Sequence, residues 1–75
     1  MTRRLTAVLT REDDGYVALC PELDVVSQGG SVEEAAANLT EAVELFLECA
    51  SASEVAGRLH GEVVVTTVEV EVPVG

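Results

Sequence analysis

Carboxylates are the side chains of this sequence with the greatest capacity for chemistry. The carboxylates considered as candidates for such chemistry are Asp13, Asp14, Glu22, Asp24, Glu33 and Glu34. Metal-dependent phosphoryl chemistry needs two or more carboxylates that converge on a pair of ions. The first two lie in an expected hairpin turn, and the last two lie where acids favour the helix dipole. The first expected strand carries none, so neither a catalytic site nor a metal site is expected.

The remaining reactive residues also lack the partners that a catalytic or cofactor site requires. His60 lies in a small polar stretch with no serine or cysteine placed beside it by a motif, and a solvent-exposed loop position is expected. Gly29 and Gly30 precede a helix, but no phosphate-loop motif accompanies them and two glutamates follow. Cys20 and Cys49 have no metal-ligand spacing, so two reduced, partly buried thiols are expected. The sequence predicts a protein that is not an enzyme and has no cofactor.

Length and charge limit the classes of partner. The 75 residues predict one domain, residues 1–75, near the size at which a single core is marginally stable. Fourteen acidic residues against four arginines give a net charge of −10. That charge repels phosphate, so direct DNA binding is not expected, whereas a basic protein partner fits. Solubility alone is the other interpretation of the acidity. Because the N-terminus lacks a cleavage site and no run is long enough to span a bilayer, a cytoplasmic protein is expected.

The elements that must position these residues are a small sheet and one long helix. Ser31 and Glu34 form the pattern of a capping box, which predicts that a helix begins just after Ser31. Apolar residues then recur at the helical period through residue 50. They are Ala35, Leu39, Ala42, Val43, Phe46, Leu47 and Ala50. This stripe predicts that one face of the helix packs on a sheet.

Strand patterns occupy most of the remaining chain. Alternating residues predict strands over residues 5–11, 16–20 and 23–28. Residues 12–15 are expected to form a hairpin turn, for which the Asp14-Gly15 pair is a strong signal. A loop or a frayed helical turn is expected after residue 50. Residues 62–72 are nearly all β-branched or alternating, which predicts a final long strand. The expected fold is therefore α+β, with a three-stranded antiparallel sheet, one long helix packed on it and a last strand, in the order β-β-β-α-β.

One helix can cover only one face of a sheet, so part of the valine-rich surface is expected to remain uncovered. Val8, Val63 and Val65 lie on the face opposite the expected core side and are predicted to contact another subunit. The marginal size of the domain also favours a homo-oligomer, either a dimer or a tetramer. Scattered surface valines are the alternative interpretation.

Residues 14–43 carry a resemblance to a known family. The run D-G-Y-V-A-L-C-P-E-L-D-V-V-S-Q-G-G-S-V-E-E-A-A-A-N-L-T-E-A-V is similar to the core signature of HicB-like antitoxins of type II toxin-antitoxin systems. The matching positions are Gly15, Tyr16, Pro21, Leu23, Gly29, Ser31, Glu34, Ala35 and Ala42. Val25 stands where the family pattern has a glycine. The resemblance implies a partial ribonuclease-H-like fold without catalytic carboxylates, in a short member without the C-terminal DNA-binding domain.

The resemblance also implies a function. Such a protein binds a small, basic, mRNA-cleaving toxin of the HicA type and neutralises it by direct contact, and an acidic surface suits that partner. The alternative is an orphan oligomeric scaffold or regulatory protein of the same fold with no toxin. The acidic residues expected to contact a partner are Glu22, Asp24, Glu33, Glu41, Glu44 and Glu48.

Overall fold

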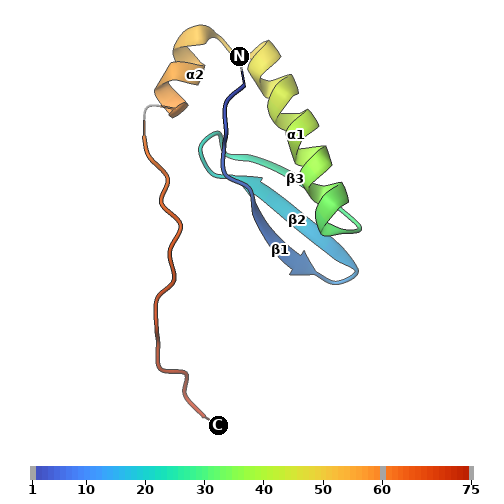
Figure 1. Cartoon of the computed structure of the whole chain (residues 1–75), viewed down its shortest axis with the longest axis vertical. Coiled ribbons are helices and arrows are strands. Elements are labelled where there is room, and N and C mark those ends of the chain that lie inside the picture. Colours follow the sequence, from blue (N-terminus) through green and yellow to red (C-terminus); the bar gives the residue numbers. More distant parts are fainter. Residues whose placement is uncertain (1, 60, 75) are drawn as a thin grey trace.

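The computed structural model describes residues 2–59 and 61–74. It contains strands β1 (Val8–Glu12), β2 (Gly15–Cys20) and β3 (Val25–Gly29), followed by helices α1 (Val32–Cys49) and α2 (Ala52–Leu59). The strands form one antiparallel sheet in the order β1-β2-β3, and α1 lies across one face of it (Figure 1). The predicted α+β class, antiparallel sheet and long packed helix are confirmed.

The first turn of α1 is stabilised as the capping pattern predicts. The Ser31 hydroxyl oxygen accepts a hydrogen bond from the Glu34 amide at 3.1 Å. The Glu34 carboxylate in turn accepts from the amide of Gly30. Both contacts satisfy amides near the start of the helix that have no partner within it. The helix therefore begins where the sequence indicates.

The core lies between α1 and the sheet and is small. Its buried members are Ala18, Cys20, Leu23, Ala35 and Leu39. Partly buried neighbours surround them, namely Leu5, Leu9, Tyr16, Val25, Val43, Phe46 and Leu59. On α1 the buried positions follow the predicted stripe, although Leu47 at its edge is 38% exposed. The mainly aliphatic core agrees with a sequence in which aromatic residues are only 3%.

Gly29, the last residue of β3, is needed for close packing rather than for an unusual backbone conformation. The structure has no glycine with positive φ among the described residues. A Cβ atom on Gly29 would lie 2.5 Å from the Ala35 nitrogen and 2.8 Å from the Glu34 carbonyl carbon. The end of β3 therefore approaches the first turn of α1 at a distance that no side chain allows. A further hydrogen bond, from Asn38 Nδ2 to the Gln28 carbonyl at 2.8 Å, joins the same two elements.

The hairpin turn lies within residues 12–15, as predicted, but the Asp14-Gly15 pair is not its central pair. Glu12 pairs with Gly15, so the two-residue loop is Asp13-Asp14 rather than Asp14-Gly15. Asp13 has a φ of 46°, in the left-handed region that aspartate tolerates better than most residues. Gly15 instead lies in β2, where a Cβ atom would meet the Gly29 carbonyl oxygen at 2.7 Å.

Two predictions for the C-terminal part were wrong. The segment expected to be a loop or frayed turn contains α2, whose first turn is capped by the Ser51 hydroxyl accepting from the Glu54 amide at 3.1 Å. The predicted final strand over residues 62–72 is not part of the sheet that the structure describes. These residues are extended and run away from the sheet (Figure 1). A β-branched composition shows that a segment is suited to a sheet, but the segment forms a strand only where another strand lies beside it.

Gly29→Ala should destabilise the protein because the new methyl group meets backbone atoms of α1 that cannot move independently. The expected loss is about 2 kcal/mol or more in the free energy of unfolding. Thermal denaturation should show a decrease of about 10 °C in Tm for a domain of this size.

Gly57→Ala is the matched control for this substitution. Nothing lies within 4 Å of the position that its Cβ atom would occupy, and the residue is helical. Its stability should stay equal or rise by about 0.5–1 kcal/mol. Equal Tm values for the two variants would contradict the close-packing role of Gly29.

Candidate functional site

Four of the six predicted partner-binding carboxylates lie together on the outer face of α1. Glu33, Glu41, Glu44 and Glu48 are all exposed, and we call this group the acidic ridge. At 3.6 residues per turn they lie opposite Ala35 and Leu39, which contact the sheet. The ridge runs along about 22 Å of helix, at 1.5 Å per residue. The described α1 carries no basic residue in its sequence, so no cation on this helix offsets the ridge.

Glu22 has a different role, because its carboxylate accepts hydrogen bonds from another segment of the chain. Oε2 accepts hydrogen bonds from the Thr6 amide at 2.9 Å and from the Thr6 hydroxyl at 2.7 Å. Oε1 lies 3.6 Å from Cys20 Sγ, which can donate to it. Partial burial raises the pKa of Glu22, but the hydrogen bonds, above all that from the Thr6 hydroxyl, outweigh burial and leave the pKa lowered. Glu22 thus fixes the segment that leads into β1.

Asp24, the remaining predicted contact residue, lies apart from the acidic ridge. It is exposed in the turn between β2 and β3 and has a φ of 57°. Aspartate is one of the few residues with a side chain that adopts this left-handed conformation readily. The position therefore has a structural reason to be Asp, in addition to any contact it makes.

The two cysteines have different environments. Cys20 is buried in the core and Cys49 is exposed, and both are free thiols. Burial is the main cause that raises the pKa of the Cys20 thiol, and the nearby Glu22 charge adds to it. Two partly buried thiols were expected, whereas Cys20 is fully buried and Cys49 is exposed.

Arg58 makes long-range polar contacts that hold helix α2 against the rest of the fold, beside the packing of Leu59 on the core. Nη1 of Arg58 donates to the Leu23 carbonyl oxygen, and the guanidinium carbon lies 5.0 Å from the centre of the Phe46 ring. A cation over an aromatic face is attracted by the ring quadrupole. These contacts join α2 to both the β2–β3 turn and α1, and no pattern in the sequence indicated them.

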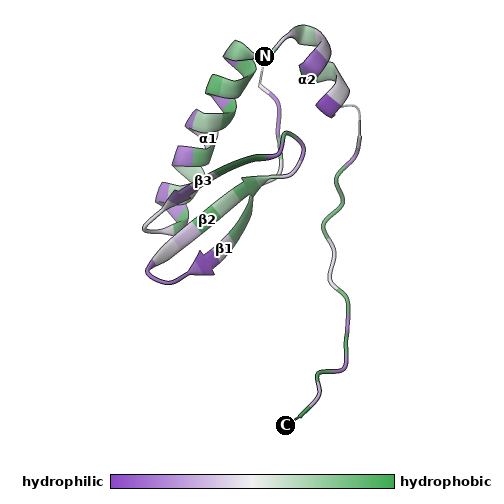
Figure 2. Cartoon of the chain, turned by 180° about the vertical axis from the view of Figure 1, so that it is seen from behind, coloured by the Kyte–Doolittle hydropathy of each residue, from purple (hydrophilic) through white to green (hydrophobic). Residues whose placement is uncertain are grey.

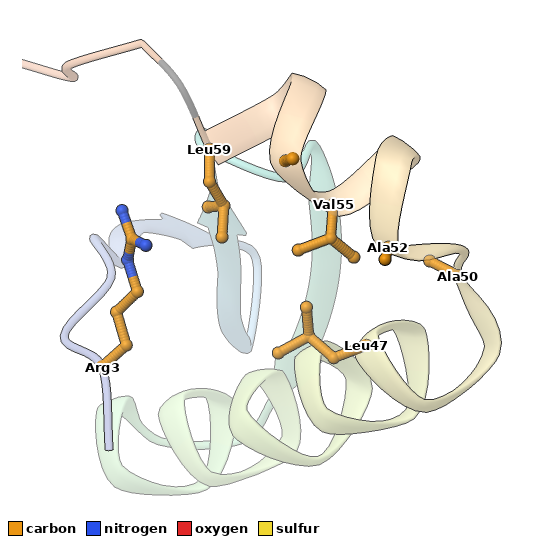
Figure 3. A pocket seen from close by; sticks show the side chains of 7 residues that line it. Arg3, Leu47, Ala50, Ala52, Val55 and Leu59 are labelled. Atoms are coloured by element: carbon orange, nitrogen blue, oxygen red, sulfur yellow. The ribbon is translucent and has the colours of Figure 1, made fainter. Parts of the chain in front are cut away.

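An open groove of about 570 Å³ lies between the end of α1, helix α2 and the N-terminal segment (Figure 3). Leu47 and Val55 point into it from the two helices, and Arg3 lies at its other side (Figure 3). Ala50, Ala52, Ala56 and Leu59 complete the lining. The lining combines apolar side chains with one cation, and the sequence pattern did not indicate this groove because α2 was not expected.

The three valines predicted to contact another subunit are exposed. Val8 is 38% exposed on the face of the sheet that α1 does not cover. The strand register places Val8 beside Leu19 and Leu19 beside Val26, which forms a row of three apolar residues across this outer face. Val63 and Val65 lie beyond α2 in the extended segment, away from this row. Figure 2 shows the alternation of hydrophobic and hydrophilic residues along that segment.

Within residues 2–59 and 61–74, no three or more His, Cys, Asp or Glu side chains lie close enough to hold a metal ion. Neither described helix is long and apolar enough to cross a membrane. His60, expected in an exposed loop, lies outside the described residues.

Glu22→Gln should destabilise the protein at neutral pH, since it removes the charge that the Thr6 donors stabilise. A rough loss of 1 kcal/mol is expected for charge-assisted hydrogen bonds at a partly exposed site. Because the folded-state pKa lies below the ordinary value of 4.5, this stability is present above 4.5 and is lost as the pH falls through the folded-state pKa. Urea denaturation from neutral pH to below 4.5 should therefore show a shrinking difference between variant and parent.

Glu44→Gln is the control, because it removes the same charge from an exposed position on α1. Its stability should stay within about 0.5 kcal/mol of the parent. A deficit at neutral pH as large as that of Glu22→Gln would refute the specific role of the Thr6 contacts.

Sequence comparison identifies relatives over most of the chain. A UPF0150 protein of Helicobacter pylori (strain J99) is 39% identical over 67 residues, which cover 88% of this chain and 93% of that protein. Two UPF0150 proteins of Synechocystis are also similar. One, ssr1765, is 51% identical over 57% of this chain and 57% of its own length, and the other, ssl0738, is 42% identical over 64% and 69%. No protein-family model and no solved structure matches. The extent of the first similarity shows that this chain belongs to the UPF0150 family.

Proposed function

We propose that this protein is an antitoxin-like binding protein that neutralises a small, basic, mRNA-cleaving toxin of the HicA type by direct contact. The observation that carries the proposal is the acidic ridge, a row of exposed carboxylates on one face of α1. The resemblance of residues 14–43 to HicB-like antitoxins supplies the class of partner. UPF0150 membership is consistent with this function but does not specify it.

Electrostatics support a basic partner for the acidic ridge. The chain has a net charge of −10, and the ridge concentrates four carboxylates on one solvent-facing surface. Complementary charge accelerates encounter and excludes acidic or neutral competitors, whereas it contributes less to the final affinity. Binding through this surface should therefore weaken as ionic strength rises, because salt screens exposed charges.

The second candidate function is an orphan oligomeric scaffold or regulatory protein of the same fold. The exposed valines of the extended C-terminal segment and the apolar row on the outer face favour self-association. The two functions differ in their need for a partner gene. A neighbouring reading frame for a short basic protein would support the first, and its absence would support the second.

The test is co-expression with the short basic protein encoded beside this gene, followed by co-purification and an RNA-cleavage assay. We expect a complex in which cleavage is suppressed. The variant Glu41→Gln/Glu44→Gln/Glu48→Gln should slow association about tenfold at low salt, because electrostatic steering is lost. Surface plasmon resonance at several salt concentrations measures this rate.

The matched control is Glu12→Gln/Asp13→Asn/Asp14→Asn, which removes three charges from the hairpin instead of the ridge. It should reduce the association rate much less than the ridge variant does. Equal rates for the two variants would exclude the ridge as the contact surface. Failure of the two proteins to associate, with cleavage unchanged, would exclude the antitoxin function itself.

A further inference from the structure

We propose that residues 62–72 of one copy add as a fourth strand along β1 of a second copy, and that the two copies exchange these segments reciprocally. We call residues 62–72 the C-terminal tail. This proposal concerns self-association and does not depend on a toxin partner. It gives a pairing partner, β1 of the second copy, to a strand-forming segment that has none in the single chain.

The C-terminal tail carries the features of a strand without the contacts of one. Its valines are between 68% and 80% exposed at Val64, Val65, Val68, Val70 and Val72. Over residues 61–74 the backbone makes no hydrogen bond to another described residue. A β-branched segment of this kind is stabilised mainly by packing beside another strand. The same segment left exposed is a site of intermolecular pairing.

The charges favour β1 as the receiving strand. In the sheet β1-β2-β3, both β1 and β3 present an open edge within the described chain. Three of the four arginines lie on β1 or on the segment that leads into it, and β1 also ends in Glu12, whereas β3 (VVSQG) has no charged residue. The tail carries Glu62, Glu69 and Glu71. Opposite charges on adjacent strands attract, so this arrangement favours pairing of the tail with β1.

The side-chain alternation agrees with the same placement. Arg11 shares the α1-facing side of β1 with Leu9, and Val8 lies on the outer side. If Glu69 and Glu71 lie beside Arg11, strand alternation puts Val68 and the other even-numbered tail valines on the outer side. They then extend the Val8–Leu19–Val26 row onto a fourth strand. One register thus satisfies both the charges and the apolar residues.

The path of the chain indicates a second copy rather than the same sheet. The tail begins at a hollow lined by Leu59, Glu62, Val63 and the N-terminal segment 3–6. It then runs away from the sheet on the β1 side (Figure 1). Eleven extended residues span about 36 Å, more than the roughly 17 Å of β1, so the tail can pair along the whole strand of a neighbour. Reciprocal exchange fills both free β1 edges and lets the two outer faces pack together.

Charge exchange between two variants tests the proposal. Arg11→Glu and Glu69→Arg/Glu71→Arg each put like charges at the proposed tail–β1 contact. Sedimentation of each variant alone should show dimer dissociation at least about tenfold stronger than in the parent. Mixing the two variants restores opposite charges at both contacts, so a heterodimer should form with near-parental affinity. Native mass spectrometry identifies the heterodimer because the variants differ in mass.

Two further variants locate the contact. Val68→Asp/Val70→Asp should dissociate the dimer while circular dichroism shows an unchanged fold, since these side chains are 80% and 72% exposed in the single chain. Val74→Asp introduces the same kind of change beyond the tail, at a fully exposed position, and should leave the mass at the parental value.

Three results would overturn the proposal. A monomeric parent protein would mean that the tail is unpaired or folds onto its own β1. A dimer that survives removal of residues 62–75 would place the interface on another surface. Failure of the mixed variants to form a heterodimer would exclude β1 as the receiving strand, even if the tail is required. All three measurements use this protein alone, so they are independent of the toxin-binding experiment.

Discussion

The close approach of Gly29 to the first turn of α1 is the contact on which the rest of the fold depends. It brings the end of β3 against the backbone at Glu34 and Ala35, which sets where the helix begins relative to the sheet. The capping contacts of Ser31 and Glu34 start the helix at that point. Once the start is fixed, the apolar stripe of α1 lies over Ala18 and Cys20, and the opposite face must point into solvent. The acidic ridge is therefore a consequence of how the core is closed.

Because one helix covers only one face of the sheet, apolar residues on the other face remain exposed. The α1-facing side of the sheet contributes to a core of only five buried residues. The outer side retains the Val8–Leu19–Val26 row, and the extended segment beyond α2 retains exposed valines. A domain of this size buries a smaller share of its surface when it folds alone than a larger domain does. The uncovered apolar residues and the acidic ridge lie on different surfaces, so self-association and binding of a basic partner can occur together.

Much of the central region could be predicted because its signals are local. The capping box and the helical stripe are read within one turn or a few turns, and alternation identified all three strands of the sheet. Helix α2 had a local signal as well, since Ser51 and Glu54 repeat the capping spacing, but the small polar composition around them favoured a loop. The hairpin lies within the predicted residues 12–15, but the Asp14-Gly15 signal did not indicate that Asp13 adopts the left-handed conformation in its loop.

The sequence by itself determined the three strands of the sheet, the long helix α1 and their order, and the acidic character of the outer face of α1. Only the tertiary structure decided that Glu22 is bonded to Thr6, that Arg58 holds α2 on Leu23 and Phe46, and that residues 62–72 do not join the sheet of their own chain. The physical reason is the range of the interactions. Periodicity and capping act between neighbours in the chain, whereas hydrogen bonds across 16 or 35 residues and the choice of a strand partner depend on where the folded elements meet.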